Sequence, residues 1–193
     1  MAAAFRTPTE SIGKFFPSVT LFGATLALLD RESIPCALIG AGALAVHGVS
    51  RSTYDIDLLA TSTRLLEDAV WAPMVEEGVT VDVRRGDASD PLRGVVRLQQ
   101  TTERDVDVVV GRQRWQQDVL ARARPLQILG CEVPVVLKSD LILLKLFAGG
   151  HQDLWDIEQL LATVEPDVFD AVDASMFQLP DDCRIQWALL KER

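Results

Sequence analysis

Hydrophobic and polar residues follow two different periods along the first 137 residues of the chain. Short apolar or alternating runs bounded by turn residues predict strands, and apolar residues three to four positions apart predict helices. The predicted strands are 36–40, 54–60, 80–86, 94–100, 105–111 and 126–136, the last as a strand or one arm of a hairpin. The predicted helices are 18–33, with Ser18 as its N-cap candidate, 41–49, closed by Gly48, 63–78, which Pro73 kinks or splits, and 112–124.

The last third of the chain has helical periodicity throughout, with predicted helices over 138–150, 152–164, 166–177 and 183–193. Strands in the first part and helices in the last form an α+β pattern, a small mixed sheet flanked by helices with a helical C-terminal third. A length of 193 residues, 48% of them hydrophobic, fits a single domain. The sheet and its helices are expected over 18–137 and the helical C-terminal part over 138–193.

The net charge of −9 argues against a protein that coats nucleic acid by bulk electrostatics, because such binding needs an excess of Lys and Arg. The segment 84–124 is nevertheless rich in arginine, and it forms either a local basic face or a set of solvated strand and helix edges. It holds nine of the fifteen arginines: Arg84, Arg85, Arg93, Arg97, Arg104, Arg112, Arg114, Arg122 and Arg124.

Signals for export, membrane insertion and cysteine chemistry are missing from the sequence. The first ten residues lack the charged and apolar regions of a signal peptide, and no eighteen apolar residues run together. Cys36, Cys131 and Cys183 are far apart and have no C-x-x-C spacing. We therefore expect a cytoplasmic protein with no membrane partner and with reduced cysteines that act as small hydrophobic residues.

Two carboxylates interrupt the predicted strand 54–60. Asp55 and Asp57 lie at i and i+2, so both side chains leave the same face of the strand, with Cα atoms about 6.5 to 7 Å apart. A divalent cation keeps such a pair ionised, and oxygen ligands at a partly open site suit Mg²⁺. Asp107, deep in the apolar run of the predicted strand 105–111, is the candidate third ligand for a two-metal site. Asp105 is expected either to support the metal ligands from behind or to be a solvent carboxylate. A lone D-x-D pair is also typical of a solvated strand edge.

Upstream of the acids, the segment 38–48 (LIGAGALAVHG) reads as a strand, a glycine turn and a short helix. Backbone N–H groups at a helix start favour phosphate. The glycines match neither common phosphate-loop signature, so the evidence lies in their position fifteen residues before Asp55. A phosphate cradle beside a carboxylate pair is typical of a nucleoside triphosphate bound through metal. His47 is expected to be a hydrogen-bonded packing residue rather than a base.

The run from Gly40 to Asp57, GAGALAVHGVSRSTYDID, resembles the signature of the minimal nucleotidyltransferases of the DNA polymerase β superfamily, in which a glycine turn and an HG-x-x-R-x-T segment precede D-x-D. Within that superfamily it is most similar to the bacterial group that includes the AbiEii-type toxins of type IV toxin–antitoxin systems. The segment 144–161 (LKLFAGGHQDLWDIEQLL) is similar to the helical motif of that group. With the order of elements between the two motifs, the resemblance extends over roughly residues 18 to 163.

The resemblance implies a role for each matching residue. The implied metal ligands are Asp55, Asp57 and Asp107, the implied nucleotide contacts are Gly40, Ala41, Arg51, Thr53, Lys145, Asp153 and Asp156, and the implied catalytic set is Asp55, Asp57, Asp107 and Lys145. Lys145 would pair with phosphates, or else snorkel from an apolar helix, and Asp153 and Asp156 would orient the nucleotide or brace the helix. Two residues depart from the family pattern: Ala41 replaces a Gly or Ser, which leaves only its backbone for binding, and His151 replaces a common Arg, which makes that contact dependent on pH.

The implied activity is transfer of a nucleoside monophosphate from an NTP to an acceptor hydroxyl, with Mg²⁺ or Mn²⁺ as cofactor. In related toxins the acceptor is a tRNA 3′ end; a protein hydroxyl and a small molecule such as an aminoglycoside are the next candidates, and an antitoxin is a candidate partner. The alternative is a non-catalytic nucleotide-binding or protein-interaction module with a degenerate form of the same fold. Ala41 and His151 favour that alternative, whereas the complete set of acids and Lys145 count against it.

Overall fold

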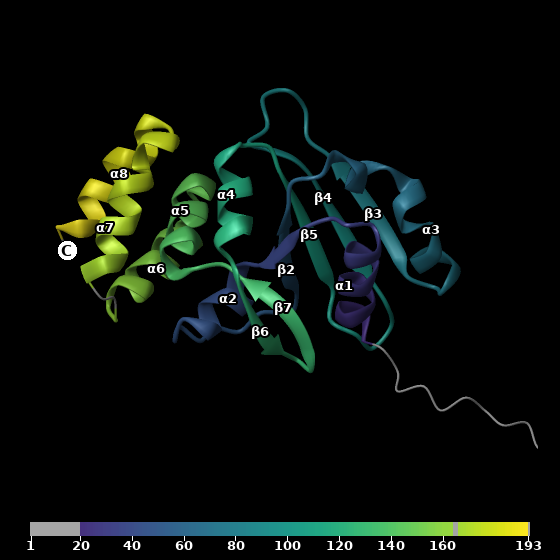
Figure 1. The fold of residues 1–193 in the computed structure, drawn as a ribbon. Helices are drawn as coiled ribbons and strands as arrows, with labels where there is room; N and C mark the ends of the chain where they lie inside the picture. Colours follow the sequence, from purple (N-terminus) through teal and green to yellow (C-terminus); the bar gives the residue numbers. More distant parts are fainter. Residues whose placement is uncertain (1–19, 164–165, 193) are drawn as a thin grey trace, which may run out of the picture.

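The computed structural model describes residues 20–163 and 166–192, in which eight α-helices surround one seven-stranded mixed sheet (Figure 1). The α+β prediction is confirmed. The strands are β1 (Cys36–Leu38), β2 (Ile56–Ala60), β3 (Thr80–Arg85), β4 (Leu92–Gln99), β5 (Val106–Gly111), β6 (Arg124–Ile128) and β7 (Cys131–Val135), in the spatial order β3-β4-β5-β2-β1-β7-β6. The helices are α1 (Leu21–Arg31), α2 (Gly40–Val46), α3 (Asp68–Glu76), α4 (Trp115–Arg122), α5 (Lys138–Ala148), α6 (His151–Leu161), α7 (Pro166–Ser175) and α8 (Asp181–Lys191), with 3₁₀ turns η1 (Thr63–Leu66) and η2 (Met176–Gln178).

The two faces of the central strands differ in polarity. In β5, Val106, Val108 and Val110 are fully buried and belong to the main hydrophobic core. On the equivalent face of β4, Gly94 lies against Leu66 of η1, and α1 and α3 also pack on this part of the sheet. Because side chains alternate along a strand, the intervening residues point to the opposite face, where the acidic residues lie.

Strand register aligns four charged residues across that second face. β2 and β5 are parallel and pair Asp57 with Asp107, β4 is antiparallel to β5 and pairs Arg97 with Asp107, and β3 pairs Asp82 with Arg97. The result is a row of side chains, Asp82, Arg97, Asp107 and Asp57, from the edge strand to the middle of the sheet. The charge alternates along the row until the last two residues, which are both acidic.

The predicted helix 63–78 is wrong as a single unit, and the break is not where the proline predicted it. The chain forms η1 and then α3, with an extended residue at Glu67 between them, while Pro73 lies inside α3. The indole N–H of Trp71, a fully buried residue, donates a hydrogen bond of 2.8 Å to the carbonyl of Leu65. This bond satisfies a backbone oxygen that a continuous helix would have used, so the break is stable in the core.

The remaining elements follow the predicted pattern closely. The region 126–136 forms a hairpin of β6 and β7, turned by Leu129 and Gly130, which both have positive φ. The first helix is capped by Thr20, whose side chain accepts a bond from the N–H of Gly23; the predicted cap Ser18 lies outside the described residues. Helix α5 packs against α6, α7 and α8, and Figure 1 shows these helices at the end of the molecule opposite α3.

The structure describes all three cysteines, which the sequence predicted to be reduced. Cys183 is buried, Cys36 and Cys131 are half-buried, and all three are free thiols. Burial raises the pKa of the Cys36 thiol to about 11, so it is protonated at neutral pH.

Among the described residues, no helix has the length and apolar character needed to cross a bilayer.

Candidate functional site

Three carboxylates meet on the open face of the sheet. Asp55 lies just before β2, Asp57 lies within β2, and Asp107 lies directly opposite Asp57 on β5. One carboxylate oxygen from each lies within 4.8 Å of the other two. The structure therefore brings together the three acids that the sequence pointed to, and the i, i+2 spacing together with parallel pairing is the reason.

Asp57 lies in a surrounding that disfavours its ionised form. Burial, and then the charges of Asp55 and Asp107, raise its pKa from 3.8 to about 6, against the opposing effect of Arg51 and Lys145. The three carboxylates have too little positive charge around them to balance their own. Oxygen ligands in such a surrounding suit a hard divalent cation. These residues therefore fit a magnesium-type ion.

Gly40 is required by the close approach of the chain to this cluster. Its φ is +57°, and a Cβ at this position would lie 1.9 Å from Oδ2 of Asp57. Any side chain here would displace the carboxylate or the backbone. The hydroxyl of Thr53 holds Asp55 from the other side, donating to its Oδ1 at 2.5 Å. Gly40 and Thr53, both predicted as nucleotide contacts, are thus seen to shape the acid cluster itself.

Arg97 is a member of the site that sequence reasoning missed. Its Nε donates to Oδ1 of Asp107 at 2.8 Å and its Nη2 donates to Oδ2 at 2.5 Å, while Nη2 also lies 3.9 Å from Oδ2 of Asp55. The hydrogen bonds to Asp107 raise the pKa of the Arg97 guanidinium above its usual range. Both oxygens of Asp107 are engaged, so a metal ion that uses this carboxylate must compete with the guanidinium. In the sequence, Arg97 was only one arginine among nine.

A second polar cluster joins α5 to α6. Nζ of Lys145, almost fully buried, donates to Oδ1 of Asp153 at 3.0 Å and to Oδ2 of Asp156 at 2.5 Å. Asp156, completely buried, also lies 3.4 Å from Nε of Arg51 and accepts a bond of 3.2 Å from Gln152. Lys145 therefore does not snorkel to solvent, and Asp153 and Asp156 hold it in place. Gln152 had no distinguishing signal in the sequence.

A pocket of about 430 Å³ lies between the acid cluster and α5. Its polar lining includes Gly40, Arg51, Asp57, Lys145 and Asp153. Apolar lining comes from the sheet and from α5: Leu59, Val109, Leu141, Leu144 and Phe147. The cavity thus combines two cationic side chains, two carboxylates and a set of apolar side chains. Such a lining suits a ligand with both phosphates and a flat apolar part.

The other residues singled out in the sequence lie outside this pocket. Ala41 is buried in α2, so its side chain is a packing group. His151 is exposed at the start of α6. His47 places Nε2 2.8 Å from the carbonyl oxygen of Val136, and burial lowers its pKa, which matches the expected packing role. Asp105 is half-buried and accepts a bond from the side-chain amide of Gln99 at 2.7 Å.

Comparison with known proteins gave matches only at the level of structure. No family model and no curated protein sequence matches the chain. Among solved structures, it is similar to the antibiotic-resistance factor ANT(2'')-Ia (17% identity, TM-score 0.45, 91% of each chain covered). It is also similar to the lincosamide antibiotic adenylyltransferase LnuA (13% identity, TM-score 0.47, 74% of this chain and 96% of that one). A third is an antigenic nucleotidyltransferase-like protein from Paracoccidioides brasiliensis (17% identity, TM-score 0.48, 84% of this chain and 88% of that one).

Proposed function

We propose that this chain is a divalent-metal-dependent nucleotidyltransferase that moves a nucleoside monophosphate from an NTP to an acceptor hydroxyl. The observation that carries the proposal is the meeting of Asp55, Asp57 and Asp107 within 4.8 Å beside a pocket that contains Lys145 and Arg51. Three oxygen donors next to two cations suit a metal-bound triphosphate better than they suit a structural ion pair.

Each residue has a distinct task in this proposal. Asp55, Asp57 and Asp107 would hold Mg²⁺ or Mn²⁺, which when bound would neutralise charge on the α-phosphate and polarise the acceptor hydroxyl. Lys145 and Arg51 supply positive charge to the triphosphate in the pocket, and Asp153 and Asp156 hold Lys145 in position.

The transfer itself exchanges one bond to phosphorus for another. The acceptor oxygen forms a bond to the α-phosphorus while the bond from that phosphorus to the bridging oxygen breaks, and pyrophosphate leaves with the electron pair. The hydroxyl proton passes to Asp107, whose two oxygens also accept the hydrogen bonds of Arg97.

The acceptor that we place first is a tRNA 3′ end, followed by a protein hydroxyl and then a small molecule. The support for this order is the resemblance of segments 40–57 and 144–161 to the AbiEii-type toxins, and the same resemblance supports a role as the toxin of a toxin–antitoxin pair. Such a toxin would be neutralised by a partner protein.

The test incubates the protein with each α-labelled NTP, Mg²⁺ and either total tRNA or a lysate fraction, beside the variant Asp55→Asn. We expect label on an acceptor with the wild-type protein and none with the variant, because the variant lacks one metal-binding carboxylate. Equal labelling by both proteins would overturn the proposal. Asp105→Asn, a change at a half-buried carboxylate outside the triad whose bond from Gln99 an amide oxygen can still accept, is the matched control and should transfer label normally.

One observation favours a second candidate, a non-catalytic nucleotide-binding module with a degenerate site. Arg97 engages both oxygens of Asp107, and a permanent internal cation at that position would replace the metal. The two candidates differ in metal binding. A Mn²⁺ titration that shows binding to the wild-type protein and weaker binding to Asp57→Asn supports the enzyme, and nucleotide binding with no metal dependence supports the module.

A further inference from the structure

A second pocket, of about 500 Å³, lies on the other side of the acid triad. Asp107 is part of its wall, whereas the pocket with Lys145 and Gly40 contains Asp57. Asp57 and Asp107 are direct neighbours across β2 and β5, so one pocket reaches the triad at β2 and the other at β5. They also share Pro91 and Leu92 at the start of β4. In an in-line displacement, the attacking group and the leaving group lie on opposite sides of the phosphorus, so one pocket fits each partner.

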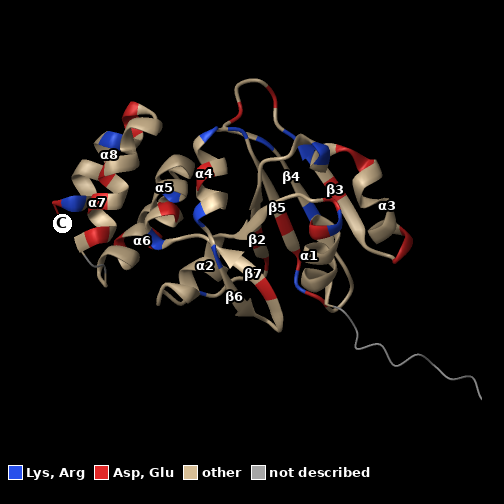
Figure 2. Cartoon of the chain, viewed as in Figure 1, with Lys and Arg blue, Asp and Glu red and all other residues tan. Residues whose placement is uncertain are grey.

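Arginine dominates the charged lining of the second pocket. Its charged lining residues are Arg84, Arg85 and Arg97, against Asp90 and Asp107. A metal ion on Asp107 would cancel most of the charge of that carboxylate, leaving the pocket with excess positive charge. In Figure 2, basic and acidic positions lie side by side on the central strands of the sheet, as the pairing of β4 with β5 requires.

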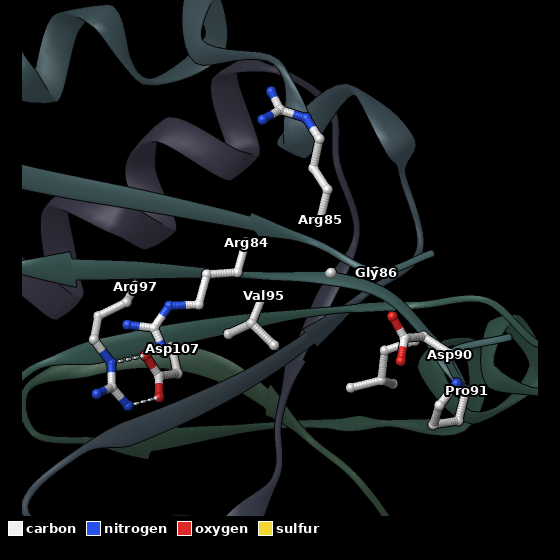
Figure 3. Close-up of a pocket in the computed structure, with 10 residues that line it drawn as sticks. Arg84, Arg85, Gly86, Asp90, Pro91, Val95, Arg97 and Asp107 are labelled. Carbon is white, nitrogen blue, oxygen red and sulfur yellow. Dashed lines mark hydrogen bonds and ion pairs between the residues drawn. The ribbon is translucent and has the colours of Figure 1, made fainter. Parts of the chain in front are cut away.

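The three arginines are not equally free to bind a ligand. Arg97 is held by Asp107. Arg85 donates a hydrogen bond to the carbonyl of Leu66, and its side chain extends away from Asp107 in Figure 3. Arg84 extends toward Arg97 and Asp107 in the same view. Its pair with Asp82 is exposed to solvent, with 68% of the Arg84 side chain accessible. Exposed pairs contribute little free energy, so Arg84 can exchange this partner for a ligand at small cost.

Register brings Arg84 and Arg97 close together on the open face. Arg84 pairs with Val95 across β3 and β4, and Val95 is two residues from Arg97, so the two arginines are diagonal neighbours. The carboxylate of Asp82, which is opposite Arg97 in the register, already pairs with Arg84, and a ligand anion would take its place beside the two guanidinium groups. Guanidinium groups bind phosphate oxygens in a planar, paired geometry, which makes a phosphate ester the chemistry that fits best.

We propose that the pocket between Arg84 and Asp107 binds the acceptor, and that the acceptor carries a phosphate group close to the hydroxyl that is modified. The inference rests on the proposed function and adds to it the chemical class of the second substrate. It argues against polycationic acceptors such as aminoglycosides, because their ammonium groups would meet the guanidinium group of Arg84 in the pocket. Arg84 is the residue that contacts the phosphate.

The first experiment measures binding without transfer. A short 5′-labelled single-stranded RNA with a free 3′ hydroxyl is titrated by fluorescence anisotropy with wild-type protein, Arg84→Gln and Arg124→Gln. Arg124 is an exposed arginine of β6 that lines neither pocket, so it is the matched control. We expect Arg84→Gln to weaken RNA binding about tenfold, as for loss of one charge-assisted contact, and Arg124→Gln to leave it unchanged.

The second experiment offers RNA, glucose 6-phosphate, glucose and tobramycin as acceptors with α-labelled NTP and Mg²⁺. Labelling of RNA or glucose 6-phosphate supports the inference, and the comparison of these two separates a polynucleotide from a small phosphate ester. The KM for the acceptor should rise in Arg84→Gln while the KM for NTP stays unchanged.

Three results would overturn the inference: preferential labelling of tobramycin or glucose, RNA binding by Arg84→Gln as tight as by wild type, or no RNA binding by wild type together with no labelling of glucose 6-phosphate. Failure of the proposed function has a different signature. RNA binding that depends on Arg84, with no label on any acceptor, leaves the anion site standing and refutes nucleotidyl transfer.

Discussion

Replacing Asp57 by Asn should make the protein more stable and less active. The folded protein raises the pKa of this carboxyl from 3.8 to about 6, so its ionised form is disfavoured in the fold. A rise of about two units, at 1.36 kcal/mol per unit, corresponds to a penalty of about 3 kcal/mol when the group is ionised in both states. Asn has nearly the same shape and no charge, and it therefore removes this penalty while keeping the contact with Gly40.

The sign of the pH dependence follows from the raised pKa. Below pH 3.8 the carboxyl is protonated in both the folded and the unfolded chain and contributes no penalty. As the pH rises toward 6, the folded state keeps a proton that the unfolded chain has lost, and the free energy of unfolding falls. The stability gain of Asp57→Asn should accordingly be about 1 kcal/mol at pH 4.5 and about 3 kcal/mol at pH 8.

Urea denaturation with EDTA present, followed by tryptophan fluorescence at both pH values, measures this gain. Asp105→Asn is the control, because Asp105 is only half-buried and an amide oxygen can still accept the bond from Gln99; its effect should stay within about 0.5 kcal/mol. Replacing EDTA with Mg²⁺ should stabilise the wild-type protein and reduce the difference in stability between it and Asp57→Asn, since the cation compensates the charge of the Asp57 carboxylate. A gain that is equal at both pH values, or no gain at pH 8, would refute the electrostatic account of the triad.

Three further substitutions test neighbouring parts of the site. Gly40→Ala should destabilise the fold by about 2 kcal/mol or more and weaken Mn²⁺ binding. Gly48 is the control, because it also has a positive φ but no described atom lies within 4 Å of an added Cβ. Gly48→Ala should cost about 1 kcal/mol and leave Mn²⁺ binding intact, as thermal melts and metal titration would show. Arg97→Gln should bind Mn²⁺ about tenfold more tightly, because Asp107 is released from its guanidinium; weaker binding in a calorimetric titration would contradict this competition. Lys145→Gln should destabilise the fold by about 3 to 5 kcal/mol in urea, since it leaves a completely buried carboxylate without its closest cation; a loss below 1 kcal/mol would refute the pairing.

The sequence predicted elements better than it predicted their pairing. Periodicity predicted the strands and helices, because the spacing of apolar residues along a short segment shows which face of that segment is buried. The i, i+2 spacing likewise predicted the convergence of Asp55 and Asp57. The contact of Arg97 with Asp107 depends on the register between β4 and β5, which shifts between Leu92 and Gly94, and no local pattern records such a shift.

The same limit explains the error in the region 63–78. Its apolar spacing continues through the break, so periodicity alone predicts one helix. The observed break at Glu67 depends on the hydrogen bond from Trp71 to the carbonyl of Leu65, a contact made only after the segment has packed on the sheet. Pro73, the obvious local signal, is accommodated within α3 instead.

The charges of the site are balanced in two separate groups, and this has a consequence for substrate binding. Arg97 neutralises part of the triad, while Lys145 and Arg51 are held by Asp153 and Asp156. A triphosphate that binds Lys145 competes with Asp153 for it, and a metal that binds Asp107 competes with Arg97. Each substrate alone therefore breaks ion pairs without full compensation, whereas metal and triphosphate together replace both sets of charges. Binding of the two should be cooperative, and because coupling free energy is reciprocal, Mn²⁺ should tighten NTP binding by the same factor by which NTP tightens Mn²⁺ binding.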